Sequence, residues 1–249
     1  MPQAAAKIRL HLATEAAAFE PGAEVALERE QATYLGAVMR LGQGARLMVF
    51  NGRDGEWLAE VAALTKRSGA LRLLEPLRPA MTPPDLWLLF APIKKARTDF
   101  IVEKACELGC RRILPVFTEY TNAERVNRAR LQAHCVEAAE QCGLVFVPEV
   151  AEPSTLSALL AGWTGERRLM FCSERGGRPA RAALAEADRT APWAVLTGPE
   201  GGFSAAEAAR LESLPGARAV SLGPRILRAD TAAVAVITLW QAMLGDWEG

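Results

Sequence analysis

Apolar and polar residues follow two different rhythms along the chain. Up to about residue 80, short apolar runs are separated by Asn-Gly, Asp-Gly and Ser-Gly pairs, which are strong signals for β-hairpins. One helix is expected among them, over about residues 30–39, with Leu35, Val38 and Met39 on its apolar face. This pattern is typical of a small β-barrel. The predicted strands are residues 46–50, 57–64 and 70–74, separated by Asn51-Gly52, Asp54-Gly55 and Ser68-Gly69.

A proline-rich segment over residues 76–84 separates this part from the rest of the chain. Its prolines stand at positions 76, 79, 83 and 84. Proline-rich segments behave as semi-rigid spacers, and domain boundaries often fall in them. We therefore expect two domains, a β-rich one over residues 1–80 and a second one over residues 81–249.

After this segment, apolar runs alternate with helical patterns. Repeated strand–helix units imply an α/β domain with a largely parallel sheet and helices on both faces. Two helices are expected over residues 98–108 and 127–142, the first with Gly109 as its C-terminal cap. The predicted strands are residues 86–91, 113–117, 144–147, 169–172, 193–196 and 219–222.

Two glycine-containing loops stand out between residues 196 and 241. The first contains Gly198, Pro199, Gly201 and Gly202, and leads into a helix that a capping box should start. The residues of that capping box are Ser204 and Glu207.

The second loop, residues 223–228, follows the last predicted strand. It leads into a final helix that Asp230 or Thr231 could cap. Ligands bind at the carboxyl ends of strands in parallel α/β sheets, so both loops are expected to line one pocket. The alternative is a pair of ordinary turns. Glu200 in the first loop, and Arg225 and Arg228 in the second, favour the pocket.

Composition limits the choice of function. The chain has 29 basic and 29 acidic residues, so any affinity for nucleic acid must come from local patches. The five cysteines lack the close spacing of a zinc site and are expected to be buried thiols in a reducing compartment. Neither a signal peptide nor a membrane span is predicted. These features favour a soluble cytoplasmic protein.

The sequence lacks the usual signs of several enzyme classes. It has only two histidines, no phosphate-binding Walker loop and no Gly-x-Gly-x-x-Gly fingerprint. No metal site or catalytic triad can be built from its spacing. Chemistry that needs no covalent protein intermediate fits this inventory, and methyl transfer is such chemistry because the cofactor supplies the reactive group.

The motif LTGPEGGFS followed by LGPRILRADTAA resembles the ribosomal RNA small-subunit methyltransferase E family. That family belongs to the knotted, S-adenosylmethionine-dependent SPOUT methyltransferases. The likeness continues in EKACELGCRRILPVFTEYT and EAAEQCGLVFVPEV. It implies a PUA-like N-terminal β-barrel, a C-terminal α/β domain with a trefoil knot, and a homodimer formed through the knotted domain.

The resemblance implies that the two loops hold S-adenosylmethionine. Bare glycines would let the backbone approach the cofactor closely. Two of the apolar positions, Leu196 and Leu222, could instead be ordinary core leucines. The implied cofactor-binding residues are Leu196, Thr197, Gly198, Glu200, Gly201, Gly202, Leu222, Gly223, Ile226 and Leu227.

The family's target is a uridine of small-subunit (16S) ribosomal RNA, methylated at ring nitrogen N3. Removal of the N3 proton spreads negative charge onto the neighbouring carbonyl oxygens, which a fixed guanidinium would stabilise. Arg228 is the preferred candidate and Arg225 the second, although either could instead pair with Glu200 or Asp230. No general base is obvious from the sequence. Glu200 is the nearest carboxylate by motif and is the second catalytic candidate, and orienting the loop is its alternative role.

RNA contacts are expected from basic residues in both domains. Lys94 and Lys95 directly follow a predicted strand, where the sheet edge should face a ligand. A solvated charged face is the alternative for this pair. Arg9 and Arg40 match basic positions of the family's N-terminal domain, and Arg225 is a further candidate. Leu144 stands where the family usually has Arg, so one basic contact is missing.

The sequence leaves two rival functions open. One is a knotted methyltransferase that acts on another RNA, such as transfer RNA. The other is a non-catalytic RNA-binding factor for ribosome assembly. The preferred partner is small-subunit ribosomal RNA within the assembled subunit, with no membrane partner.

Overall fold

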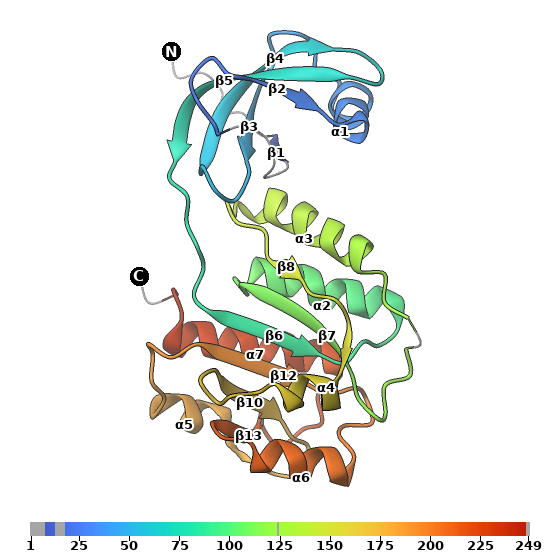
Figure 1. The fold of residues 1–249 in the computed structure, drawn as a ribbon, viewed down its shortest axis with the longest axis vertical. Helices are drawn as coiled ribbons and strands as arrows, with labels where there is room; N and C mark the ends of the chain where they lie inside the picture. Colours follow the sequence, from blue (N-terminus) through green and yellow to red (C-terminus); the bar gives the residue numbers. More distant parts are fainter. Residues whose placement is uncertain (1–7, 13–17, 124, 248–249) are drawn as a thin grey trace. The chain divides into compact units, whose positions relative to one another are not determined.

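The computed structural model of the chain describes residues 8–12, 18–123 and 125–247 (Figure 1). It forms two compact units. The first takes in the described residues up to Thr82 together with Ala139–Phe146, and the second takes in Pro83–Ala138 and those from Val147 onward. In the described ranges, no helix is both long and apolar enough to span a lipid bilayer.

A five-stranded sheet is the framework of the first unit. Strand β1 pairs with β3 in parallel, and the other pairs are antiparallel, in the order β1-β3-β4-β5-β2. The hairpin turns between β3, β4 and β5 fall where the Gly-containing pairs predict them. The strands are β1 (Arg9–His11), β2 (Glu24–Leu27), β3 (Arg46–Phe50), β4 (Glu56–Leu64) and β5 (Gly69–Arg78).

The hydrophobic core of this unit follows from the two-residue period of its strands. Along β4, Trp57, Ala59 and Val61 are buried while the residues between them are more exposed. Alternate side chains of a strand point to opposite faces of the sheet, so one face is apolar. Leu47 and Leu71 from the neighbouring strands pack into the same core cluster.

The helix predicted over residues 30–39 consists of two short pieces. An α-helix, α1 (Arg29–Thr33), continues into a π-helical turn, η1 (Tyr34–Val38), where the amide of Met39 donates to the carbonyl of Tyr34. This wider turn changes which residues face the core. Leu35 is buried as predicted, but Val38 is 65% exposed, so its place on the apolar face was wrong.

A sheet of parallel strands forms the centre of the second unit. Its order is β11-β13-β10-β12-β6-β7-β8, and β9 pairs with β7. Neighbouring strands in this order, and β9 with β7, pair in parallel. The strands are β6 (Leu86–Phe90), β7 (Arg112–Phe117), β8 (Glu149–Val150), β9 (Ser154–Thr155), β10 (Arg168–Cys172), β11 (Arg178–Pro179), β12 (Trp193–Thr197) and β13 (Ala217–Ser221).

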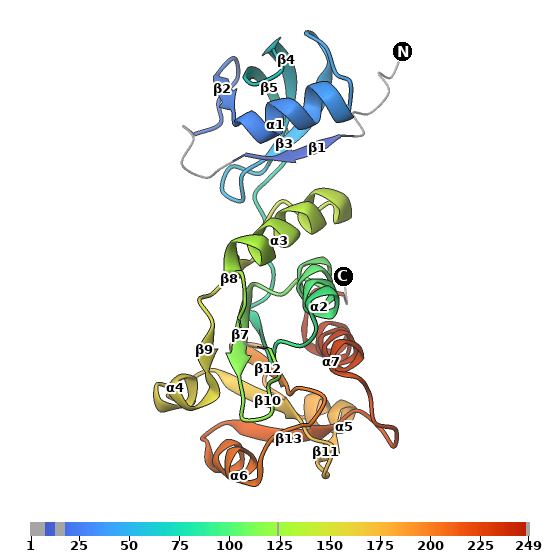
Figure 2. The same cartoon turned by 90° about the vertical axis from the view of Figure 1, so that its right-hand side faces the viewer.

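Helices cover both faces of this sheet (Figure 2). Helices α2 (Lys95–Glu107), α5 (Ala180–Ala185) and α7 (Ala229–Leu244) pack together on one face, and α4 (Leu156–Ala161) and α6 (Ala205–Ser213) pack on the other. Helix α3 (Arg128–Cys142) belongs to the second unit up to Ala138 and to the first unit from Ala139 onward. The predicted α/β class, with a parallel sheet flanked by helices and a small β-rich N-terminal unit, is confirmed.

Three local expectations in this region were wrong. Residues 144–147 form no strand, and the next strand begins only at Glu149, after Pro148, which has no amide hydrogen to donate. The last helix begins at Ala229 with Arg228 as its N-cap, so neither Asp230 nor Thr231 caps it. Cys142 is exposed rather than buried.

A buried carboxylate ties the first unit together. Glu56 accepts hydrogen bonds from Arg9 Nε and Arg78 Nε, both at 2.7 Å, and its side chain is only 4% exposed. Burial alone would raise the pKa of Glu56, but the hydrogen bonds from Arg78 and Arg9 outweigh it and lower this pKa. The ionised carboxylate therefore stabilises the folded unit at neutral pH.

Replacement of Glu56 by Gln should lower the free energy of unfolding by about 3 kcal/mol, because it leaves the Arg9 guanidinium buried without its partner charge. The folded-state pKa of Glu56 lies below the ordinary value of 4.5. The loss is therefore full above that pH and shrinks as the pH falls through the folded-state pKa. Chemical denaturation at a series of pH values measures both effects.

Glu24→Gln on β2 is the matched control. Glu24 pairs with Arg72 at 3.1 Å, but the two side chains are 55% and 48% exposed. An exposed pair of this kind contributes about 0.2–1 kcal/mol. Equal losses from the two variants would contradict the stabilising role given to the buried pair.

Candidate active site

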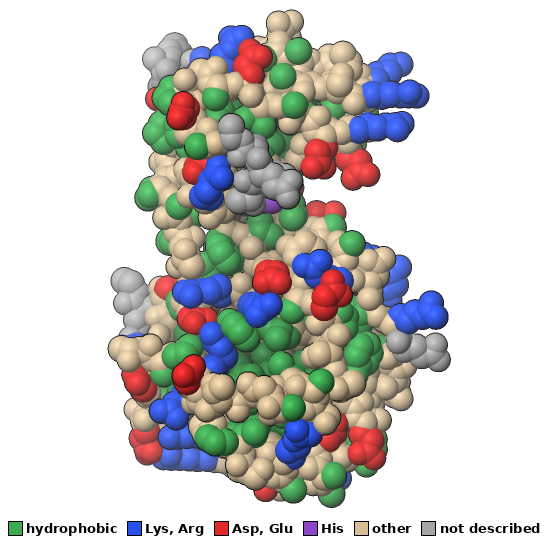
Figure 3. Space-filling model, viewed as in Figure 1, with side chains coloured by type: hydrophobic (Ala, Val, Ile, Leu, Met, Phe, Trp, Pro, Cys, Tyr) green, Lys and Arg blue, Asp and Glu red, His purple; other side chains and the backbone are tan. Residues whose placement is uncertain are grey.

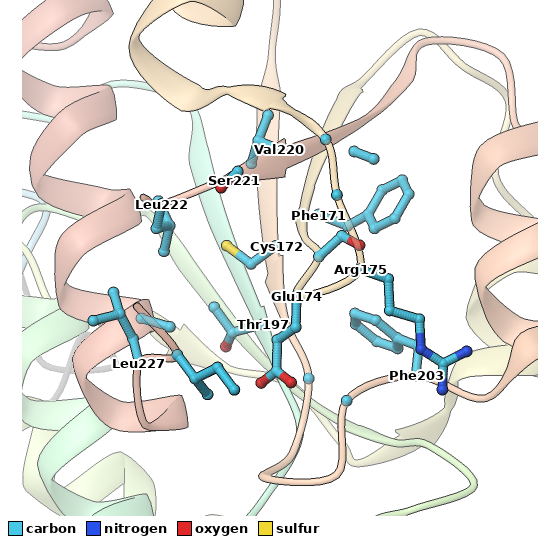
Figure 4. Close-up of a pocket in the computed structure, with 18 of the residues that line it drawn as sticks. Phe171, Cys172, Glu174, Arg175, Thr197, Phe203, Val220, Ser221, Leu222 and Leu227 are labelled. Carbon is cyan, nitrogen blue, oxygen red and sulfur yellow. The ribbon is translucent and has the colours of Figure 1, made fainter. Parts of the chain in front are cut away.

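Three loops meet at one edge of the parallel sheet. Strands β13, β10 and β12 are direct neighbours, so their carboxyl ends lie side by side. The loops that follow them, residues 173–177, 198–203 and 222–228, surround a cavity of about 550 Å³ (Figure 4). The pocket predicted from the last two loops is therefore present, and a third loop completes it.

Aromatic packing shapes one wall of this cavity. The rings of Phe171 on β10 and Phe203 are 6.3 Å apart and nearly perpendicular. Gly198 lies against the same Phe203, because a Cβ atom at this glycine would be 3.2 Å from the ring. A side chain at this position would therefore require the Phe203 ring to shift.

Thr197, the last residue of β12, brings a polar atom without a partner to the cavity. This residue is 1% exposed and lines the cavity. Its hydroxyl oxygen has no hydrogen-bond partner among the described residues. Buried hydroxyl groups are normally paired, since an unpaired one costs free energy. The unpaired Thr197 hydroxyl therefore indicates a place where a bound ligand would form a hydrogen bond.

The loop after β10 was missed from the sequence. Its residues 173–177 read Ser-Glu-Arg-Gly-Gly, and all five line the cavity. A glycine pair directly after an apolar run was the available signal. Gly177 has a φ angle of +152°, and a Cβ atom there would lie 2.9 Å from the backbone of Val220 on β13. This close approach keeps the third loop against the neighbouring strand.

A second depression, of about 460 Å³, adjoins the cavity. Glu174, Ile226 and Leu227 line both hollows. Lys94, Arg97, Glu200 and Arg228 complete the lining of the second depression. The two predicted catalytic residues, Arg228 and Glu200, therefore lie at the same depression, together with the predicted RNA contact Lys94.

Among the described residues, the two loop arginines do not form the ion pairs that were the alternative to their catalytic role. Asp230 forms its ion pair with Arg97, with Nη1 and Oδ2 3.0 Å apart. Within the described ranges, no ion pair links Arg225 or Arg228 to Glu200 or Asp230. Both arginines are exposed beside the hollows.

The predicted cofactor residues fall into three places. Leu196 is fully buried in the core cluster on one face of the sheet, as its alternative interpretation had it. Glu200 lines the second depression instead of the cavity. The others line the cavity: Thr197, Gly198, Gly201, Gly202, Leu222, Gly223, Ile226 and Leu227.

The predicted RNA contacts are also divided. Lys94 lines the second depression, Arg225 lines the cavity, and Lys95 is exposed at the start of α2. Arg40 is exposed in the first unit, with a left-handed φ of 54°. The Arg9 guanidinium instead donates to Glu56 and to the carbonyl oxygens of residues 139, 140 and 144, within its own unit. These contacts occupy Arg9, so we leave it out of the proposed RNA contacts.

Both signs of charge occur on the visible surface of the second unit. On the face of the second unit that Figure 3 shows, basic and acidic side chains are interspersed. This agrees with a formal net charge of zero for the whole chain. Attraction to a phosphate backbone therefore depends on local groups such as Lys94 and Arg228.

Histidine, cysteine and metal-ligating side chains are the other possible catalytic groups of the molecule: His134 is not among the residues that line the two hollows, whereas Cys172 lines the cavity. His134 lies on α3 among carboxylates, with Nδ1 3.0 Å from Glu103 Oε1. Burial raises the pKa of the Cys172 thiol, which lines the cavity, to about 12, so this thiol stays protonated near neutral pH. Among the described residues, no cluster of three or more His, Cys, Asp or Glu side chains could hold a metal ion.

Comparison with known proteins decides the family. Residues 81–241 match the family model of the RNA methyltransferase domain, and residues 27–74 match that of the RNA methyltransferase PUA domain. The chain is 31% identical over 209 residues to ribosomal RNA small subunit methyltransferase E of Rickettsia conorii, covering 82% of this chain and 83% of the relative. The chain belongs to the ribosomal RNA small subunit methyltransferase E family. This confirms the resemblance inferred from the two loop motifs.

Further members and solved structures agree with this assignment. The methyltransferase E of a Synechocystis species is 33% identical over 227 residues, covering 89% of this chain and 74% of that protein. A methyltransferase from Legionella pneumophila, in complex with S-adenosylmethionine, is 28% identical with a TM-score of 0.85, covering 96% and 98% of the two chains. The methyltransferase E of Neisseria gonorrhoeae, bound to S-adenosylmethionine, is 26% identical with a TM-score of 0.85, covering 96% and 99%.

The close approach of the third loop to β13 predicts a difference between two adjacent glycines. Gly176→Ala should lower the free energy of unfolding by about 1–2 kcal/mol, because φ at Gly176 is +125° although the space around it is open. Gly177→Ala should cost about 1–3 kcal/mol more, because its methyl group would also overlap the backbone of β13. Chemical denaturation measures both changes, and equal losses would show that the approach to β13 is not constrained.

Proposed function

We propose that this protein is a methyltransferase that transfers the methyl group of S-adenosylmethionine to N3 of a uridine in small-subunit ribosomal RNA. The main support is the cavity at the carboxyl ends of β10, β12 and β13, with a depression lined by both basic and acidic side chains beside it. Family membership and the cofactor named in the Legionella and Neisseria structures point to the same activity.

The residues around the cavity fit S-adenosylmethionine. A volume of about 550 Å³ lies within the range of about 300–1,000 Å³ that is usual for small-molecule sites. Leu222 and Leu227 would contact the apolar parts of the cofactor, and the Thr197 hydroxyl would pair with one of its polar groups. When bound, the cofactor supplies a methyl group on a positively charged sulfur, which an adjacent nucleophile can attack.

The second depression suits the RNA substrate. Lys94 and Arg97 line it with positive charge, although Arg97 also pairs with Asp230. Side chains of this kind hold phosphate groups and fix the position of the strand. A uracil ring in this depression would lie next to the cavity, because the two hollows share lining residues.

Arg228 is the proposed electrostatic catalyst. Loss of the N3 proton leaves negative charge on the carbonyl oxygens of uracil. Arg228 is the N-cap residue of α7, and the fixed start of that helix would hold its guanidinium at the depression. A cation held in place before the reaction stabilises developing charge without reorganisation.

The family resemblance extends the proposal to the oligomeric state of the protein and to the form of its substrate. We infer a homodimer formed through a knotted second domain, and a substrate that is the assembled small subunit. Ile226 supports a covering partner, because this isoleucine is 81% exposed at the rim of both hollows. A second copy of the chain or the RNA would remove its side chain from water.

Thr197→Val tests the cofactor site. The substitution replaces an unpaired hydroxyl with a methyl group of the same shape, so the folded protein should lose no stability. Affinity for S-adenosylmethionine should fall about tenfold through loss of one hydrogen bond. Calorimetric titration and thermal unfolding measure the two quantities.

Thr118→Val is the matched control for this experiment. Thr118 is also buried after a parallel strand, but its hydroxyl lies 2.9 Å from the hydroxyl of Thr121. This variant should lose about 1 kcal/mol of stability and keep its cofactor affinity. An unchanged affinity in Thr197→Val would remove Thr197 from the cofactor site.

Methyl transfer to small ribosomal subunits tests the function itself. The protein is incubated with labelled S-adenosylmethionine and subunits from cells that lack the corresponding gene, and the product is identified by mass spectrometry. We expect N3-methyluridine. Another methylated nucleoside would contradict the proposed target atom, and cofactor binding without transfer to any RNA would contradict the enzymatic role.

A further inference from the structure

Methylation of N3 requires an acceptor for one proton. In the proposed reaction, the N3–H bond breaks and its electron pair stays on nitrogen. This pair then forms the N3–methyl bond, while the sulfur–methyl bond breaks and its electrons remain on sulfur. The proton must leave to a group that can reach N3 while the uracil ring lies against the methyl donor, and the sequence motifs named no clear candidate beyond Glu200.

The boundary between the two hollows identifies a better candidate. Glu174, Ile226 and Leu227 line both the cavity and the second depression, and only Glu174 can accept a proton. Figure 4 shows its carboxylate extending toward Thr197 and Leu227, whereas the neighbouring Arg175 extends away beside Phe203. The Glu174 carboxylate therefore lies where the methyl donor and the uracil ring would meet.

Other carboxylates near the site are placed less well. Glu200 lines only the second depression, and Glu212 lines only the cavity. Asp230 is engaged by Arg97. Within the described part of the chain, Glu174 has no recorded hydrogen bond or ion pair, so both of its oxygens can accept from a substrate.

We propose that Glu174 is a catalytic residue that accepts the N3 proton of the target uridine. The inference rests on the proposed function and adds the base that the reaction needs. Proton acceptance at Glu174 leaves the negative charge on uracil, and Arg228 and Lys94 line the depression that would hold this ring. The carboxylate and the two cations would thus act on one uracil ring: the carboxylate would accept its proton, and the cations would pair with its oxygens.

Three variants test this role. Glu174→Gln keeps the shape of the side chain but removes the proton acceptor, and Glu174→Asp keeps a carboxylate. Glu166→Gln is the matched control, because Glu166 is an exposed residue just before the amino end of β10, whereas Glu174 follows its carboxyl end. Single-turnover methyl transfer to small subunits is measured for each, with separate binding titrations of S-adenosylmethionine and RNA.

Glu174→Gln should slow methyl transfer by about 10²–10⁴-fold, the usual contribution of a general base. Its affinities for S-adenosylmethionine and RNA should match those of the unchanged protein. Glu174→Asp should recover part of the rate, and Glu166→Gln should behave as the unchanged protein.

Several results would overturn the assignment. A Glu174→Gln variant with a normal rate of methyl transfer would exclude the role as a proton acceptor. An affinity for S-adenosylmethionine that falls as much as the rate would make Glu174 a cofactor-binding residue instead. Absence of N3-methyluridine with the unchanged protein would overturn the proposed function itself, which separates that failure from failure of the Glu174 assignment.

Discussion

The parallel direction of β13, β10 and β12 is the constraint on which the site depends. Because these three neighbours run the same way, the loops that follow them emerge at one edge of the sheet. Helices α5, α6 and α7 then carry the chain back over the faces of the sheet, so the loops remain free to surround a cavity. An antiparallel neighbour at any of these positions would send its loop to the opposite edge.

Much of this arrangement could be predicted from local chemistry. Turn pairs such as Asn51-Gly52 mark the hairpins of the first unit, since their conformations suit tight turns. Ser204 and Glu207 form the predicted capping box, with Ser204 Oγ and Glu207 Oε2 each accepting a backbone hydrogen bond. Such features depend on residues close together in sequence, and the sequence pattern is therefore sufficient for them.

Features that depend on distant partners could not be predicted. The third loop joins the site because β10 lies between β12 and β13, an order that apolar runs alone do not reveal. Arg9 is basic by type, but its buried pairing with Glu56 gives it an internal role. The exposure of Val38 depends on a π-helical turn that an α-helical period does not anticipate. For the third loop and Arg9, partners distant in sequence determine the role, whereas for Val38 a local departure from the α-helical period does.

Hydrogen exchange with and without S-adenosylmethionine tests the three-loop site most directly. If the cofactor binds in the cavity, exchange of backbone amides should slow in all three segments, residues 173–177, 198–203 and 222–228. Protection of only the last two would contradict a site completed by the loop after β10. Protection confined to other parts of the chain would contradict the placement of the cofactor altogether.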